Sequence, residues 1–244
     1  IVTETYDLFN APLFIGCYAA VVVIAFIKMA VLSQLKLPTP TAYESSAGQG
    51  RPIGVIARQP RFLVAITTSM MAWGIMVLLM SSTPLAMPVN HHPITAIAFV
   101  IQWHIVGMFA PSFFTGSLIA RFGLANIMLI GTLLQVSAVA INLSGLGVWH
   151  FWASNFVLGI GWNFLFIGGT TLLTTTYFQA ERAKVQGLND LLVFGTAALA
   201  SFGSGALHHF LGWQTVNMMV LPLVLLVLMS NIWLRRMPEP QPAE

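Results

Sequence analysis

The sequence predicts an all-α, polytopic membrane helical bundle, and three features of its composition support this fold class. Apolar residues make up 57% of the 244 residues and charged residues only 7%, and the mean hydropathy is +0.83. These values lie far outside the range of soluble globular domains. Between Arg61 and Glu181 the chain holds a single Asp, Glu, Lys or Arg, which is Arg121.

Seven stretches are apolar and long enough to cross a bilayer. A span takes about 20 residues of helix, because backbone polar groups find no water in the hydrocarbon core. The first stretch is preceded by Glu4 and Asp7 rather than by basic residues, so it does not resemble a secretory signal peptide. The single cysteine, Cys17, rules out an internal disulfide framework. We expect helices over residues 10–34, 62–83, 93–119, 124–143, 149–178, 185–210 and 213–234.

Basic residues indicate how these spans are oriented, because Lys and Arg accumulate on the cytoplasmic side. If the chain begins outside, every Lys and Arg falls at or near the cytoplasmic face, and the outer loops hold none. We therefore expect a multi-pass protein of the plasma membrane, the inner membrane in a bacterium, with its N-terminus outside and its C-terminus cytoplasmic. The net charge of +3 reflects this orientation, so no nucleic-acid partner is expected.

A short glycine and leucine pattern recurs at two helix ends. The spacing GxLxxxxG closes the third predicted helix at residues 116–123 and the sixth at residues 205–212. Helices two to four and five to seven would then form two three-helix units with opposite membrane orientations, as in inverted-repeat transporters.

The stretch GSLIARFG, residues 116–123, resembles the loop motif of the major facilitator superfamily, in which a glycine, a small-residue turn, a basic residue and a second glycine follow one another. The runs FQAERAKVQGLND and GWQTVN also resemble the later part of such a transporter. One position departs from the family pattern, because Ala120 stands where an acid commonly precedes the basic residue. This departure argues against an acid-anchored latch at the turn.

The resemblance implies an MFS-like architecture with inverted three-helix repeats. Residues 1–34 would be the transmembrane helix that ends a first half, which is mostly absent from this chain. Residues 35–61 would be a cytoplasmic linker, 62–236 the six-helix C-terminal half and 237–244 a cytoplasmic tail. We therefore expect a fragment of a longer protein, with the missing N-terminal half as its partner in the lipid bilayer.

The same resemblance implies a secondary active transporter rather than an enzyme. It would move a small organic solute by alternating access, coupled to protons, without a cofactor. The competing interpretation is a non-transporting seven-helix membrane sensor or receptor-like protein. Against a retinal protein or a receptor, the last predicted helix contains no lysine, and the motifs NPxxY and DRY do not occur.

Polar and aromatic side chains within the spans mark the candidate substrate site, because such groups are costly in lipid unless they face protein or water. Asn155, Trp162 and Asn163 share a face of the fifth predicted helix at about 100° per residue. The indole would offer flat contact and the amides would orient a ligand. Trp73 stands among methionines suited to an adaptable pocket. The alternative role for these residues is helix packing, with glycines permitting close approach.

His104 is the candidate coupling residue. It lies near the middle of the third predicted span, where an imidazole that titrates near neutral pH would suit proton coupling. The alternative is a neutral histidine that is hydrogen-bonded to a neighbouring helix. Pro111, on the same side, removes the backbone hydrogen bond to the carbonyl of Gly107 and predicts a hinge.

Arg121, Glu181 and Asp190 are the candidate gating residues at the cytoplasmic helix ends. In the family, acids and bases at these ends form contacts that hold one conformation and break in the other, and Arg121 with Glu181 is the expected pair. The alternative is ordinary positive-inside charge, with Asp190 favoured by a helix dipole. No metal site is expected, because neither cysteine nor carboxylate accompanies the outer histidines, which are His91, His92, His150, His208 and His209.

Overall fold

The computed structural model describes residues 15–35 and 50–238, and within these ranges it contains helices and no strand. The chain divides into two compact units, residues 1–48 and 49–244. The first unit contains α2 (Ile15–Ser33), which lies inside the predicted span 10–34. The beginning of that span and most of the predicted linker, residues 36–49, lie outside the described residues.

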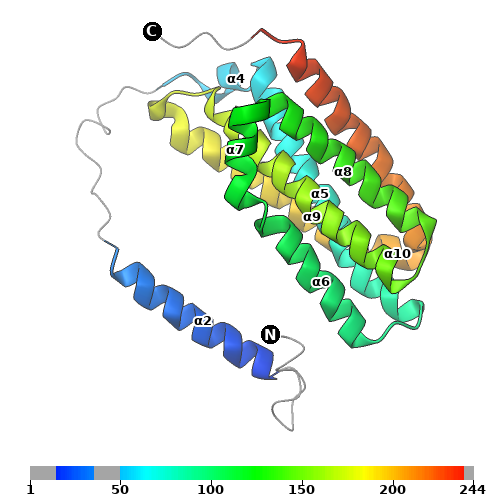
Figure 1. The fold of residues 1–244 in the computed structure, drawn as a ribbon. Helices are drawn as coiled ribbons and strands as arrows, with labels where there is room; N and C mark the ends of the chain where they lie inside the picture. Colours follow the sequence, from blue (N-terminus) through cyan, green and yellow to red (C-terminus); the bar gives the residue numbers. More distant parts are fainter. Residues whose placement is uncertain (1–14, 36–49, 239–244) are drawn as a thin grey trace. The chain divides into compact units, whose positions relative to one another are not determined.

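The second unit is a helical bundle whose long helices run up and down beside one another (Figure 1). Among the described residues, four helices are long and apolar enough to cross a membrane, and a bent pair adds a fifth span. The elements are α4 (Ile53–Ile56), α5 (Pro60–Val89), α6 (Ile94–Phe109), α7 (Ser112–Phe122), α8 (Leu124–Ser144), α9 (Val148–Thr174), the 3-10 turn η1 (Gln179–Glu181) and α10 (Arg182–Arg235).

The break between α6 and α7 occurs at the predicted hinge. The helix predicted over 93–119 is bent by 43° between Phe109 and Ser112. Pro111 has no N–H to donate to the carbonyl of Gly107, so the α-helical ladder stops there and restarts one residue later. The two pieces together have the length of one span.

The long helix α10 contains the last two predicted spans. Gly212 has φ 75° and ψ 170°, a backbone conformation that favours glycine, and it divides α10 into two arms. The second arm returns along the bundle (Figure 1). The boundary predicted between residues 210 and 213 is therefore confirmed, although backbone hydrogen bonding is continuous enough for one helix to be assigned.

The central helix α9 contacts its neighbours through glycines. A Cβ atom added at Gly159 would lie 2.6 Å from the carbonyl oxygen of His104 in α6, and one added at Gly161 would lie 2.9 Å from that of Gly131 in α8. At Gly169 an added Cβ would collide with Ser69 in α5. These three positions let backbones approach closely in the manner of small-residue membrane interfaces.

Buried amides tie the second arm of α10 to α8. Asn142 Nδ2 donates to Asn217 Oδ1 at 2.8 Å, and Asn231 Nδ2 donates to Thr132 Oγ1 at 2.9 Å. All four side chains are buried. Interhelical hydrogen bonds of this kind contribute about 0.6 kcal/mol each in membrane bundles, so they fix the register of two helices more than they raise stability.

Candidate functional site

Asn163 lies at the bend between α6 and α7, where its amide makes three hydrogen bonds. Its Nδ2 donates to the Met108 carbonyl at 2.7 Å and to Ser112 Oγ at 2.6 Å, and its Oδ1 accepts from Thr115 Oγ1 at 2.7 Å. Pro111 interrupts the helical hydrogen bonding at this bend, beside the Met108 carbonyl that accepts from Asn163. Asn163 thus joins α9 to both sides of the bend, which supports the packing role, and its contact with a substrate stays a prediction.

Asn155 holds α9 against α5 and α6. Its Nδ2 donates to Thr83 Oγ1 at 3.1 Å and to the carbonyl of Phe151 at 2.9 Å. Its own backbone carbonyl accepts a hydrogen bond from His104 Nδ1 at 2.7 Å. The side chain is buried, so this amide too is engaged within the bundle.

His104 is fully buried and keeps one nitrogen unused. A carbonyl only accepts, so the bond to Asn155 places the proton of the neutral ring on Nδ1 and leaves Nε2 as the basic nitrogen. Within the described residues, Nε2 is buried and has no hydrogen-bond partner. The ring is therefore bonded to a neighbouring helix, as the alternative interpretation expected, and it also retains a free proton acceptor.

Aromatic rings from four helices form what we call the central aromatic cluster: Trp73, Phe109, Trp162, Phe166 and Phe194. Trp73 packs edge-on against Trp162 at 5.1 Å and against Phe194 at 5.5 Å between ring centroids. Trp162 stacks on Phe166 at 5.2 Å with an interplanar angle of 14°. Trp162 is only 4% exposed, whereas Phe194 is 54% exposed. The cluster therefore runs from the core of the unit to its surface.

Two indole groups in this cluster lack hydrogen bonds. Nε1 of Trp73 and Nε1 of Trp162 are both buried and have no acceptor among the described residues. Leaving a buried donor unpaired costs about 1–3 kcal/mol, and buried indole N–H groups usually find a partner. The cluster thus contains two buried, unpaired donors beside flat apolar rings.

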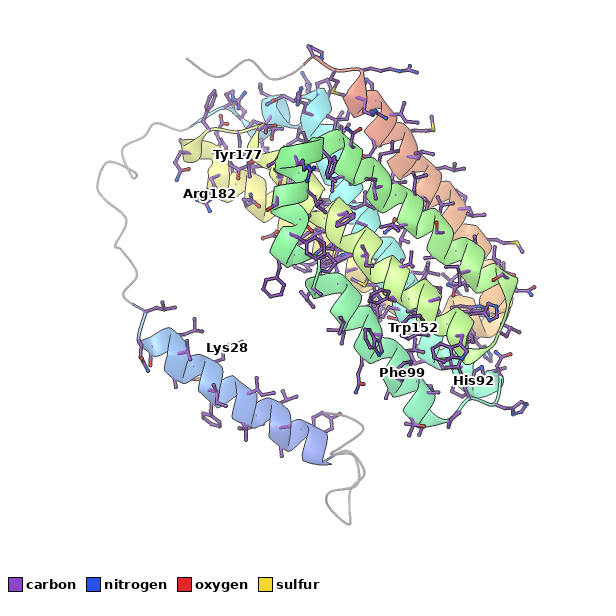
Figure 2. All side chains as sticks on the ribbon, in the orientation of Figure 1. Lys28, His92, Phe99, Trp152, Tyr177 and Arg182 are labelled. Atoms are coloured by element: carbon purple, nitrogen blue, oxygen red, sulfur yellow. The ribbon has the colours of Figure 1, made fainter. Side chains whose placement is uncertain are left out.

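A second group of rings, the outer aromatic cluster, lies at the other end of α6 and α9. It consists of Phe99, Trp103, Trp149, Trp152 and Phe156. Figure 2 shows Phe99 and Trp152 at the end of the bundle opposite to Arg182. The aromatic residues of α9 are therefore divided between two clusters, with Trp152 and Phe156 in the outer one and Trp162 and Phe166 in the central one.

Glu181 is held by a residue that the sequence analysis did not select. The carboxylate is 1% exposed and accepts from Arg51 Nε at 2.8 Å and from an Arg51 terminal nitrogen at 2.7 Å. Backbone N–H groups of Arg51 and Phe178 donate to it as well, at 2.7 and 3.0 Å. Hydrogen bonding from the Arg51 side chain is the main reason that the pKa of Glu181 falls from 4.5 to about 2.

Residues 50–59, which we call the strap, lie across the turn between α9 and α10. Besides Arg51, Gln59 Nε2 donates to the carbonyl of Thr176 at 3.1 Å. Lys184 Nζ donates to the carbonyl of Gly50 at 3.1 Å and to that of Arg51. A side chain at Gly50 would collide with Glu181. The strap is therefore closely fitted to the turn.

The expected contact between Arg121 and Glu181 is absent from the described structure. Arg121 is exposed, with its guanidinium 5.3 Å from the centre of the Phe122 ring. Glu181 has a bidentate partner in Arg51 here, so its pairing with Arg121 in another conformation stays a prediction. Asp190 is exposed and accepts a hydrogen bond from Asn189 Nδ2 at 3.2 Å. Among the described residues, no group of three or more His, Cys, Asp or Glu could hold a metal ion.

Comparison with known proteins agrees with this architecture. A riboflavin transporter of Brucella anthropi, RfnT, is 41% identical over all of this chain, and the chain spans 61% of that relative's length. An uncharacterized MFS-type transporter of Bacillus subtilis, YdeG, is 30% identical over 71% of this chain and 41% of its own length. A methylenomycin A resistance protein of the same species is 25% identical over 56% of this chain and 30% of its own length.

The sequence profile of the Major Facilitator Superfamily matches residues 63–244, which is most of the chain and nearly all of the helical bundle. Two of these three relatives are named as transporters and none as an enzyme. The helices from α6 to α10, the bend at Pro111 and the turn at Gly212 lie within the matched range. This chain is an all-α membrane protein that belongs to the major facilitator superfamily.

Proposed function

We propose that this chain is part of a secondary active transporter that moves a small heteroaromatic solute of the riboflavin type across the membrane. Alternating access would take place between this six-helix half and the partner half of the transporter, with a proton as the coupling ion. Family membership and the transporter relatives support the mode of action. The main structural support for this class of solute is the pair of unpartnered indole donors in the central aromatic cluster.

Riboflavin has a flat tricyclic ring whose carbonyl oxygens and ring nitrogens accept hydrogen bonds. Placed against Trp73 and Trp162, such a ring would accept from both Nε1 groups and contact the exposed edges of Phe109 and Phe194. Aromatic pairs contribute about 0.5–1.5 kcal/mol beyond burial. The relative named as a riboflavin transporter, at 41% identity, supports the same class of solute.

His104 is our candidate for the coupling site. Its Nε2 is a buried, unpartnered acceptor on α6, the helix that also contributes Phe109 to the central aromatic cluster. Protonation of Nε2 would place a charge inside the bundle, which is tolerated only if a partner or water reaches it. A conformational change that opens and closes access to Nε2 would therefore couple proton transfer to transport.

We further propose that the end of the bundle that carries the described Arg and Lys residues faces the cytoplasm. Arg121 and Asp190, both exposed near that end, remain our candidates for gating contacts with the other half. Arg51 joins Glu181 as the pair that anchors the strap there.

The test is riboflavin flux into proteoliposomes that contain the full-length protein, driven by a pH gradient. Trp73→Phe and Trp162→Phe keep a ring and remove the N–H, so each should raise the apparent KM about tenfold with little change in folding. Trp149→Phe, at a 69% exposed position of the outer aromatic cluster, is the matched control and should leave the KM unchanged. His104→Gln should remove the dependence on the gradient.

The flux measurements test the binding site, the coupling site and the transporter function separately. Saturable flux with an unchanged KM in both Trp variants would refute the aromatic cluster as the binding site. Gradient-driven flux that survives in His104→Gln would move the coupling site to another residue. Riboflavin binding without flux would favour the non-transporting sensor over the transporter.

A further inference from the structure

A pocket of about 420 Å³ opens at the basic end of the bundle. It lies between the start of α5, the turn from α7 to α8, and the ends of α9 and α10. Arg61 and Arg235 line it together with the first residues of α8, and Leu172, Leu234 and Met237 form apolar walls. It is separate from the central aromatic cluster, with which it shares no residue.

The two arginines lack a carboxylate partner in the described parts of the chain. The acids described there are Glu181, which is paired with Arg51, and Asp190, and neither lines the pocket. Arg61 donates to the carbonyl of Pro238, which leaves its charge unneutralised. The pocket therefore holds two positive charges without a described counter-charge.

The start of α8 adds hydrogen-bond donors to the same pocket. Gly123, with φ 85°, precedes the helix and provides no side-chain cap. Asn126 Nδ2 bonds to the Phe122 carbonyl at 2.8 Å instead of capping α8. As at any helix start, the first backbone N–H groups of α8, at Leu124, Ala125 and Asn126, have no partner within the helix, and no side chain caps them. The positive end of α8 thus supplements the arginines in attracting an anion.

The size and walls of the pocket narrow the class of anion. A water molecule takes up about 30 Å³ in the liquid, so the pocket has room for roughly 14 waters. An inorganic phosphate would leave much of that space and the apolar walls unfilled. Basic pockets between transmembrane helices near the membrane surface are suited to acidic lipid headgroups. We infer that this pocket binds the phosphodiester headgroup of an anionic phospholipid.

The inference can be tested by lipid titration of the full-length protein in a neutral detergent, with binding followed by native mass spectrometry. Phosphatidylglycerol should bind more tightly than zwitterionic phosphatidylcholine. Each basic residue near a membrane surface is worth about a fivefold change in affinity, so Arg61→Gln with Arg235→Gln should weaken phosphatidylglycerol binding about 30-fold. Arg58→Gln with Arg182→Gln removes the same charge from exposed positions outside the pocket and should change binding less than about threefold.

Three results would overturn the inference. One is an equal loss in the two double variants, which would show an effect of net charge alone. Another is the absence of any preference for phosphatidylglycerol, and the third is competition by millimolar inorganic phosphate, which would indicate a small-anion site. If the double variant does not fold, Arg235→Gln alone decides the matter, because Arg235 is exposed and has no described partner. A fivefold loss of affinity for phosphatidylglycerol is then expected, and an unchanged affinity would refute the site.

Discussion

Replacing Arg51 with glutamine should separate the strap from the turn between α9 and α10. The change removes two hydrogen bonds to the Glu181 carboxylate and one, at 3.1 Å, to the carbonyl of Thr176. The backbone N–H groups of Arg51 and Phe178 continue to donate to the carboxylate. A hydrogen bond to a charged group contributes about 1.5–3 kcal/mol, and a partner that is 36% exposed, like Arg51, contributes less. We expect Arg51→Gln to lower the free energy of unfolding by about 2 kcal/mol in total.

The loss of stability in Arg51→Gln should become smaller as the pH falls. Because the pKa of Glu181 is lowered to about 2 in the folded protein, its stabilising effect is fully present above about pH 4.5. The effect declines as the pH falls from 4.5 through 2, and it is lost below pH 2, where the carboxyl is protonated in both the folded and the unfolded state. The difference between the native protein and Arg51→Gln should therefore be constant from pH 6 to 8 and shrink toward pH 3.

The assay is thermal unfolding of the detergent-solubilised protein across this pH range. A loss of about 2 kcal/mol corresponds to roughly 4–8 °C in a unit of this size. Arg58→Gln, an exposed strap position outside these contacts, is the matched control and should shift the midpoint by less than about 2 °C. A midpoint for Arg51→Gln equal to that of the control at pH 7 would refute the reasoning, and so would a difference that persists undiminished at pH 3.

Two further predictions concern packing around α9. Gly159→Ala should destabilise the protein by about 1–3 kcal/mol, because its Cβ would lie 2.6 Å from the His104 carbonyl oxygen. Gly187→Ala in α10, where a Cβ would meet nothing within 4 Å, should be neutral or stabilising, and equal midpoints for the two variants would contradict the packing. Asn163→Ala should cost about 1–3 kcal/mol, because it leaves the buried Met108 carbonyl without its donor. Its loss of flux should follow its loss of folded protein, whereas weakened riboflavin binding in fully folded protein would show that Asn163 contacts the solute.

Local features of the sequence were sufficient to predict the spans and their interruptions. Apolar runs predicted the helices, because only a long apolar helix satisfies its backbone in lipid. Pro111 and Gly212 mark the bend and the reversal, because each changes the backbone whatever surrounds it. Helix α5 is longer than predicted, since it continues through Pro84 to Val89.

The composition of the sites was harder to predict, because it depends on residues that are distant in the sequence. The partner of Glu181 is 130 residues away in the linker, and no pattern in the linker distinguishes Arg51 from its other basic residues. Phe109 and Phe194 join the aromatic cluster from helices whose rotation the sequence does not determine. Asn163 was predicted as a site residue because polar groups in spans are costly unless they face protein or water, yet an amide that bonds to a helix bend meets the same requirement.

The glycine contacts of α9 have a mechanical consequence. Side chains can change rotamer to follow a moving neighbour, but at Gly159, Gly161 and Gly169 the adjoining helices contact a backbone with no rotamers to change. Sliding α5, α6 or α8 along α9 would separate surfaces that match only in one register. The helices around α9 should therefore move together as one rigid body. In the proposed transport cycle, the flexibility would then have to come from the bend at Pro111, the strap and the boundary with the proposed partner half.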